Sequence, residues 1–347
     1  MPACIARTSR QNPRMTIPTE MRAAVITRSG GPDVLAIQHR PVPTPGAGEV
    51  LVRVRSSALN RADLLQRSGR YPAPPGVPVD IPGLEFAGEV VSSGPGAALF
   101  SVGARVCGLV GGGAHAEYLV THERALAAVP GALDWAAAGS APEACITAHD
   151  ALVTQARIRP GDTVLIHAVG SGVGLTAVQI ARQLGATVFG TARNTSKPDI
   201  ARDLGMKAGA SPGEPGWVAS ATREWTGGRG IDIVLDLLGG DYVRESVAAL
   251  APKGRLILIG TLAGLESALD LRYMLSRRLT VRGTVLRSRP IEERIAVTQA
   301  FAREVMPWLS DGTVQPRIDC TFPLEQIAEA HMRMESNEAA GKIAILM

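Results

Sequence analysis

Three glycines, Gly170, Gly172 and Gly174, lie where a chain could bind a phosphate with its backbone alone. The apolar segment TVLIHAV (163–169) before them is typical of a buried strand, and LTAVQIARQLG (175–185) after them predicts an amphipathic helix. Without Cβ atoms this turn can approach a pyrophosphate, whose charge is stabilised by the helix N-terminus. We therefore predict a dinucleotide site. The spacing G-S-G-V-G departs from GxGxxG, so a tight turn that binds nothing remains the alternative.

The segment after the next predicted strand bears on which dinucleotide is bound. An acidic residue about 20 residues beyond the glycines accepts the ribose hydroxyls of NAD, whereas a cation there suits the 2′-phosphate of NADP. This chain instead has Thr191 and Ala192, followed by Arg193 and Lys197. Because such cations pair with a phosphate that a carboxylate would repel, we predict NADPH, with Thr191, Arg193 and Lys197 among its contacts. The alternative is that both cations belong to a solvated helix start.

The elements that must position these residues fall into two groups. From Met21, short β-rich segments alternate with Gly/Pro turns, which is typical of a mostly antiparallel, barrel-like domain. Near residue 145 the pattern changes to apolar strands alternating with amphipathic helices, which predicts an α/β fold with a doubly wound parallel Rossmann sheet. The strands expected in this sheet are 163–169, 187–192, 231–238, 255–260 and 279–286, and its helices are 175–185, 199–204 and 241–250.

The end of the chain contains a predicted helix over 291–312 and a final strand, KIAILM, that we expect to rejoin the first domain. The expected domain organisation follows from these elements. It consists of a disordered N-terminal extension (1–20), a discontinuous barrel domain (21–144 and 286–347) and the Rossmann domain (145–285). The Arg-containing, acid-poor extension would also suit an organellar targeting segment.

Composition excludes several classes of protein. The 347 residues carry a net charge of +4, which is too little for a nucleic-acid binder. The four cysteines, Cys4, Cys107, Cys145 and Cys320, have no CxxC or metal-ligand spacing. We interpret them as reduced thiols of a cytoplasmic protein. No run of about 18 apolar residues is present, so no membrane association is expected.

Several motifs in order along the chain resemble the medium-chain dehydrogenase/reductase superfamily. Within it, the chain is similar to the zinc-independent quinone oxidoreductases of the zeta-crystallin type, and most similar to the tumour-suppressor-inducible quinone oxidoreductase group. The resemblance covers about residues 21–347 and implies that the barrel domain is GroES-like and catalytic. The motifs are ALNRADLLQRSGRYP (58–72), IPGLEFAGEV (81–90), GDTVLIHAVGSGVG (161–174), GTARNTSK (190–197), GTVLRSR (283–289) and GKIAIL (341–346).

The resemblance implies where the reaction takes place. In the family, the Asn of the NxxD segment lies beside the nicotinamide and the substrate, so Asn60 is the first candidate for the catalytic site and also contacts the cofactor. Asp63 would orient the site, and Tyr71 would donate a hydrogen bond to a developing oxyanion. Each residue could instead be structural: a turn residue, a helix cap and a packed ring. Zinc-dependent relatives have Cys and His where this chain has Asn60 and Leu84, so no metal is expected.

Other cofactor contacts are implied by the same resemblance. Ser171, Gly172 and Val173 match diphosphate-binding positions, and Lys197 matches a lysine that pairs with the 2′-phosphate. Leu286 and Arg287 belong to a loop that covers the cofactor in relatives, and Asn337 lies near the phosphate end. Some relatives contact the adenosine with a Tyr after the second helix, but the segment 206–213 contains none.

The function expected from these residues is NADPH-dependent reduction of quinones or α,β-unsaturated carbonyls by hydride transfer, with the proton supplied by water. An NADPH-binding sensor or structural protein with little catalytic activity is the alternative. The resemblance also implies a homodimer formed through the edge strand 279–286. Three further polar residues, His115, His167 and Asp236, are interpreted as structural rather than catalytic.

Overall fold

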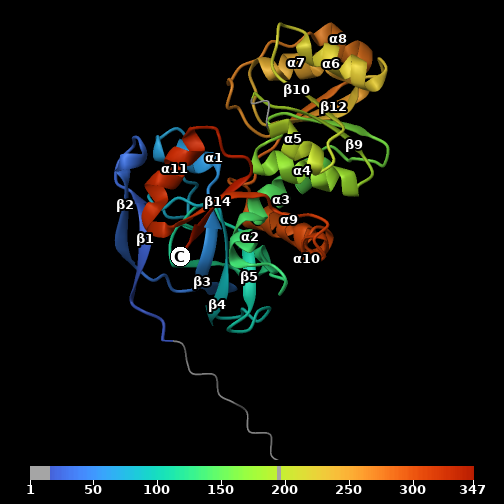
Figure 1. Cartoon of the computed structure of the whole chain (residues 1–347). Coiled ribbons are helices and arrows are strands. Elements are labelled where there is room, and N and C mark those ends of the chain that lie inside the picture. Colours follow the sequence, from blue (N-terminus) through green and yellow to red (C-terminus); the bar gives the residue numbers. More distant parts are fainter. Residues whose placement is uncertain (1–15, 194–196) are drawn as a thin grey trace, which may run out of the picture.

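The computed structural model describes residues 16–193 and 197–347, which form two large sheets and a β-ribbon (Figure 1). One sheet is six-stranded and entirely parallel, with the order β10-β9-β8-β11-β12-β13. This is the order of a doubly wound dinucleotide-binding sheet, and it confirms the predicted fold class. Its strands are β8 (Thr163–Ile166), β9 (Thr187–Thr191), β10 (Ala208–Ala210), β11 (Ile231–Asp236), β12 (Leu250–Leu258) and β13 (Thr280–Gly283).

The helices of this half include two that sequence periodicity did not reveal. Helix α6 buries Val218 and Thr222 and packs Trp217 and Trp225 partly against the core. Helix α8 has no fully buried residue, but Tyr273 and Met274 pack against the same core. By contrast, α4 buries most of its length, and its N-terminus is capped by the Ser171 hydroxyl. The helices are α4 (Gly172–Gln183), α5 (Lys197–Asp203), α6 (Trp217–Thr226), α7 (Asp241–Ala249) and α8 (Leu271–Arg277).

The second large sheet contains strands from both ends of the chain. Its order is β14-β15-β3-β4-β5-β7, with β6 also paired to β3, and a separate ribbon is formed by β1 and β2. The last strand, β15, runs antiparallel to β3, with Ala344 opposite Ala58. The strands are β1 (Glu20–Ile26), β2 (Leu35–Pro41), β3 (Glu49–Ala58), β4 (Glu85–Ser93), β5 (Arg105–Leu109), β6 (Tyr118–His122), β7 (Leu126–Ala128), β14 (Ile318–Pro323) and β15 (Lys342–Leu346).

The predicted helix over 291–312 is divided into α9 and α10. Pro307 lies in the first turn of α10, where the missing N–H costs nothing, but the same residue cannot continue α9. The remaining helices are α1 (Arg61–Arg67), α2 (Trp135–Ser140), α3 (Pro142–His149), α9 (Ile291–Glu304), α10 (Met306–Ser310) and α11 (Ile327–Glu335). Shorter turns are η1 (Pro32–Val34), η2 (Glu123–Ala125), the π-helical η3 (Asp150–Gln155) and η4 (Leu324–Gln326).

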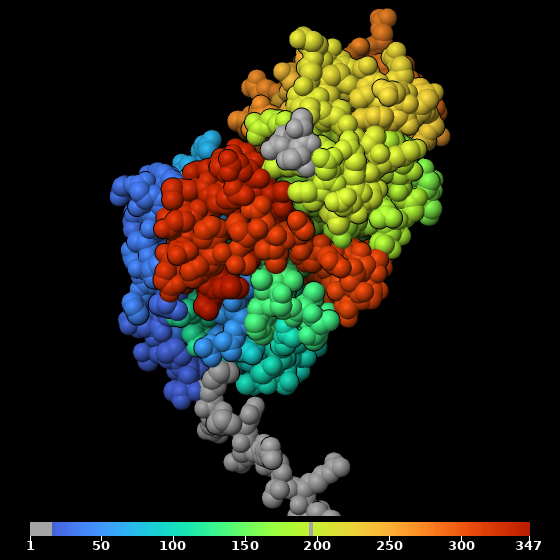
Figure 2. Space-filling view, in the orientation of Figure 1, coloured from blue at the N-terminus to red at the C-terminus, as the bar shows by residue number. Residues whose placement is uncertain are grey.

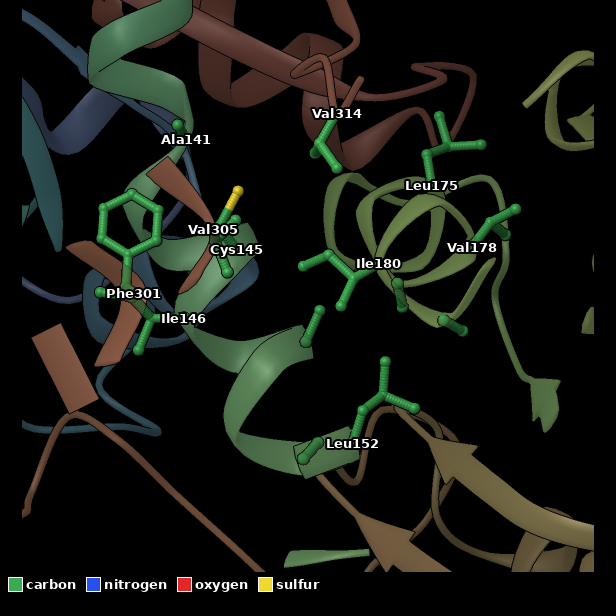
Figure 3. Close-up of a cluster of buried hydrophobic side chains, with 14 of the residues drawn as sticks. Ala141, Cys145, Ile146, Leu152, Leu175, Val178, Ile180, Phe301, Val305 and Val314 are labelled. Atoms are coloured by element: carbon green, nitrogen blue, oxygen red, sulfur yellow. The ribbon is translucent and has the colours of Figure 1, made fainter. Parts of the chain in front are cut away.

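The largest hydrophobic core joins the two halves. Helix α3 lies between α9 and α4, so that Ile146 and Phe301 belong to the same buried cluster as Ile180 (Figure 3). The segment from α11 to β15 lies at the junction as well, where Figure 2 shows the last residues in red against both the blue and the yellow-green parts. The two halves are therefore packed on each other rather than tethered by a free linker.

The N-terminal boundary differs slightly from the prediction. Residues 1–15 of the expected extension lie outside the described residues, but β1 begins at Glu20, and the Thr19 carbonyl accepts a hydrogen bond from Val42. The extension over 1–20 was therefore drawn a residue or two too long. The other domain boundaries remain predictions.

Phe301 provides a test of the joint core. Its side chain is fully buried, so Phe301→Ala should reduce the free energy of unfolding by about 3–5 kcal/mol. Val102→Ala, at a side chain that is 61% exposed, is the control and should change stability by less than about 0.5 kcal/mol. Urea denaturation of both variants measures the difference. Equal effects would contradict the packing described.

Candidate active site

Asn60 lies at the junction of β3 and α1, where its side chain is fixed at both ends. The amide nitrogen donates to Glu85 Oε1 at 2.9 Å and, at 3.3 Å, to the carbonyl of Ala58. The amide oxygen accepts from Lys342 Nζ at 2.6 Å. The predicted catalytic residue therefore has one preferred orientation.

Lys342 is a buried lysine with three acceptors. Its Nζ lies 2.6 Å from Asn60 Oδ1, 2.9 Å from the Leu59 carbonyl and 2.5 Å from Glu85 Oε1. The ammonium therefore donates two hydrogen bonds, to Asn60 and Leu59, and forms an ion pair with Glu85. Lys342 and Glu85 are 4% and 0% exposed, which makes them a buried ion pair completed by hydrogen bonds. Removing one partner of such a pair typically costs about 3–5 kcal/mol.

Asp63 holds the turn that carries Asn60. Its Oδ2 accepts from the Asn60 N–H at 2.7 Å, and its Oδ1 accepts from the Gly83 N–H at 2.9 Å. Burial would raise the pKa of Asp63, yet the His115 ring, whose Nε2 is 3.8 Å away, and the Asn60 N–H hold it below its ordinary value. The carboxylate thus links Asn60 to the loop before β4, as an orienting residue would.

Tyr71 and Arg287 form a second pair near the site. The guanidinium of Arg287 lies 4.9 Å from the centre of the Tyr71 ring and donates to the Tyr71 carbonyl at 3.3 Å. Its other donors reach the Gly111 carbonyl and Gln66 Oε1, while Leu286 is buried in the core. Arg287 therefore ties the 284–290 loop to the barrel domain. Burial raises the pKa of Tyr71, so its hydroxyl stays protonated.

The glycine turn connects strand β8 to helix α4, as predicted, but its glycines also serve a packing role that the sequence did not show. The left-handed residue is Ala168 (φ 50°), not a glycine. A Cβ at Gly170 would lie 2.7 Å from Lys197 Cβ, and one at Gly172 would overlap the stem of Lys342. These glycines therefore let two lysine side chains pack on the turn.

The start of α4 offers donors to an anion. The Ser171 hydroxyl accepts from the Gly174 N–H at 3.0 Å. The N–H groups of Gly172 and Val173 belong to the first turn, which has no partners within a helix. The turn is also attached to the chain end, because Gly341 N–H donates to the Gly170 carbonyl at 3.2 Å. This part of the site fits a diphosphate.

Thr191 does not lie with the cations that follow it. Its hydroxyl is 2.7 Å from His167 Nδ1, and His167 Nε2 is 2.7 Å from the Ser246 hydroxyl. Burial lowers the pKa of His167 to about 3, so the ring is neutral, and Thr191 is only 2% exposed. Both side chains support the strand ends, so the Thr191 hydroxyl is engaged inside the domain and is not presented to a phosphate.

Asp236 and His115 have structural partners. Asp236 Oδ1 accepts from the Leu238 and Gly239 N–H groups at 2.7 and 3.0 Å, which supports the loop after β11. His115 Nδ1 lies 2.7 Å from the Ser57 hydroxyl. Neither contact assigns a catalytic role to these residues.

Lys197 and Asn337, both expected near the 2′-phosphate, lie in contact, and Arg61 joins them. Lys197 Nζ donates to the Asn337 carbonyl at 2.6 Å, while Arg61 Nη2 donates to Asn337 Oδ1 at 2.9 Å. Burial, followed by repulsion from Arg61, lowers the pKa of Lys197, and repulsion from the exposed Arg193 contributes as well. Cations held this close repel one another, and binding an anion between them relieves the repulsion. The three cations are therefore suited to bind a 2′-phosphate.

Glu143, at the start of α3, is the titratable group that sequence reasoning missed. Its backbone N–H donates to Glu85 Oε2 at 2.9 Å. Burial and the charges of Glu85 and Asp63 raise its pKa to about 7, although Lys342 opposes this. The side chain therefore holds a proton close to neutral pH.

The missed residues left only faint signals. Lys342 is a cation next to the apolar run of β15, and Glu85 is an acid preceding the apolar segment FAGEVV. A charged residue next to a buried strand needs a buried partner of opposite charge, but a single sequence does not identify that partner. Arg61 and Glu143 have no distinguishing pattern.

Comparison with known proteins places the chain in a family. Residues 46–131 match the alcohol dehydrogenase GroES-like domain, and residues 172–303 match the zinc-binding dehydrogenase domain. Quinone oxidoreductase from Lama guanicoe is 31% identical over 94% of this chain and 98% of its own length. The chain belongs to the medium-chain dehydrogenase/reductase superfamily. The family prediction is thus confirmed, and members of this superfamily use a nicotinamide cofactor.

Two further proteins are similar to this chain over almost its whole length. A 2-haloacrylate reductase from Burkholderia is 33% identical over 93% of this chain and 98% of its own length. A mycobacterial protein solved in complex with NADPH is 30% identical, with a TM-score of 0.83 over 94% of this chain and 100% of that chain.

The zinc named in one domain description does not fit the residues at this site. A catalytic zinc needs about three Cys, His or carboxylate ligands, but Asn60 and Leu84 offer none, and the Lys342 ammonium already occupies Glu85. Within residues 16–193 and 197–347, no group of three or more such side chains could hold a metal. The same described part has no helix that is both long and apolar enough to cross a membrane.

The raised pKa of Glu143 predicts a pH dependence of stability. An unfolded glutamate titrates at about 4.3, so between about pH 4.5 and 7 the folded protein holds a proton that the unfolded chain has lost. The protonated Glu143 carboxyl therefore makes its full contribution to the free energy of unfolding below this pH range, and that contribution is lost as the pH rises through about 7. Melting temperatures between pH 4.5 and 8 should therefore fall less steeply for Glu143→Gln than for the parent. The control, Glu266→Gln at an exposed position, should follow the parent; parallel curves for all three proteins would contradict the assignment.

Proposed function

We propose that this chain is an NADPH-dependent reductase of quinones or α,β-unsaturated carbonyls that works without a metal. The observation that carries the proposal is the Lys342 ammonium, which is held against Asn60 Oδ1 and Glu85 Oε1 where zinc-dependent relatives would bind their metal. A fixed internal charge there orients Asn60, because the buried ammonium is bonded to Asn60 and Leu59 and paired with Glu85. The site thus aligns its reactants without acting as a Lewis acid.

We propose cofactor contacts at two groups of neighbouring residues, one for each phosphate group of NADPH. The first turn of α4, from Ser171 to Gly174, would hold the diphosphate, and Lys197 with Arg193 and Asn337 would hold the 2′-phosphate. The similarity to a mycobacterial protein solved with NADPH supports this cofactor. When bound, the nicotinamide supplies the hydride.

The substrate class follows from what the site lacks. Without a Lewis acid to polarise a carbonyl, the acceptor must already be electrophilic, as quinones and enones are. Asn60 would orient the reacting groups, and Tyr71 would donate its hydroxyl proton in a hydrogen bond to the oxygen on which charge develops. The names of relatives, a quinone oxidoreductase and a 2-haloacrylate reductase, support such acceptors.

Glu143 is the proposed proton donor of the reaction. Hydride addition leaves an enolate or hydroquinone anion that must gain one proton. A carboxyl with a pKa of about 7 is matched to donating a proton at neutral pH and regaining it from water. Direct delivery from water, as the sequence suggested, is the alternative.

The proposal predicts turnover that survives metal removal. Protein treated with a chelator should oxidise NADPH in the presence of ortho-quinones, para-quinones or enones, as followed by NADPH absorbance, and added zinc should not increase the rate. Asn60→Ala should lower kcat by about 100-fold, because the reactants lose their alignment. Zinc-dependent recovery of activity would exclude the metal-free proposal. Saturable NADPH binding without turnover would instead favour a sensor or structural protein.

We also propose a cytoplasmic homodimer formed through the edge of the six-stranded sheet. Strand β13 is the last of its sheet, so its outer backbone groups have no strand partner among the described residues. Leu271 and Leu275 on the preceding α8 are 67% and 78% exposed. A hollow of about 650 Å³ beside β13 and α9, which includes Val285 and Arg289, lies on this edge rather than at the candidate site.

Sedimentation velocity tests the dimer. The parent should sediment as a dimer, and Leu275→Asp should shift it toward monomer because the carboxylate would be buried in the interface. Leu99→Asp, at a 62% exposed position in the other domain, should leave the dimer intact. A parent that is monomeric at all concentrations would contradict the proposal.

A further inference from the structure

Arg61 is a cation of the barrel domain that lies close enough to the nucleotide domain to be repelled by Arg193. It is the first residue of α1 and directly follows Asn60. Its guanidinium and the Lys197 ammonium bind the same residue, Asn337, from opposite domains. Asn337 has a left-handed backbone (φ 59°) just after α11, which turns its carbonyl and side chain to these two cations.

The positive charge at this point is only partly balanced, because Glu335 and Asp319 attract Arg61 and Lys197 without forming a salt bridge to either. Glu335 is paired with Arg67, and Asp319 and Glu338 are paired with Arg333. In the described part of the chain, Arg61, Arg193 and Lys197 form no salt bridge with a carboxylate. Burial and repulsion from Arg193 lower the pKa of Arg61. Three cations with this little compensation are suited to a dianion such as a phosphate monoester.

We propose that Arg61 is a positioning residue through which the 2′-phosphate of NADPH aligns the active site. This inference rests on the proposed function. A phosphate held by Lys197 and Arg193 on one domain would also bind Arg61 on the other, and so would fix the backbone at Asn60. The 2′-phosphate then contributes to turnover as well as to affinity.

The path from the phosphate to Asn60 is short and stiff. Arg61 is joined to Asn60 by one peptide bond, and the Asn60 N–H is held by the Asp63 carboxylate. On its other side, Asn60 is bound to Lys342, whose stem packs on Gly172 of the diphosphate turn. Asn60 thus lies between two contacts with the cofactor site, one at each phosphate group.

Binding of a fragment isolates the contact from catalysis. We expect Arg61→Gln to weaken the affinity for adenosine 2′,5′-bisphosphate by at least about tenfold and to leave the affinity for 5′-ADP almost unchanged, as measured by calorimetry. Arg61→Lys should restore part of the affinity. Arg28→Gln, at a side chain that is 69% exposed, is the control. Equal losses for both fragments would overturn the assignment of Arg61 to the 2′-phosphate.

Kinetics test the positioning role. With NADPH, Arg61→Gln should lower kcat by about tenfold, whereas with NADH it should leave kcat unchanged. Lys197→Gln should mainly raise KM for NADPH. In the parent, inorganic phosphate should increase turnover with NADH, and Arg61→Gln should abolish that increase. An effect on KM alone, or an equal loss of kcat with both cofactors, would overturn the positioning role. Absence of turnover in the parent would contradict the proposed function, while the fragment titration would still report on Arg61.

Discussion

The buried ion pair between Lys342 and Glu85 is the interaction on which the site depends. It neutralises a carboxylate that is inaccessible to water, and its remaining N–H groups fix Asn60 and the Leu59 carbonyl. Its second carboxylate oxygen receives the Glu143 N–H, so the start of α3 is attached to the same point. A charge buried without these partners would be strongly unfavourable. Because the partners come from β4, β15, α3 and the turn before α1, the ion pair holds these four elements in one arrangement.

This arrangement explains how a superfamily that includes zinc enzymes can hold a site of different chemistry. A bound metal and a buried ammonium both place positive charge among oxygen atoms, but the metal keeps a position open for substrate, whereas the ammonium here does not. What the lysine provides is order. In the proposed mechanism, Asn60 aligns the reacting groups, and the acceptor must itself be electrophilic.

The fold could be predicted from the sequence because local patterns determine it. Strands β8, β9, β11 and β12 are apolar and bounded by turns, and the Ser171 cap marks where α4 begins. Helices α6 and α8 were not predicted, although α6 has an apolar side formed by Trp217, Val218 and Trp225. Of the site, Asn60, the glycine turn, Lys197 and Asn337 were found from motifs. Lys342, Glu85, Arg61 and Glu143 were not, because their roles arise from pairings across as many as 283 residues of sequence.

The position of β15 has a consequence for synthesis on the ribosome. Strands β3 and β4 and residue Glu85 are translated before the six-stranded sheet, but the cation that neutralises Glu85 is on β15, which is translated after it. Until then, the nascent barrel contains an acid without a counter-charge and an edge of β3 without its neighbour. The sheet that contains β3 and β15 is therefore completed only after the whole six-stranded sheet has been translated.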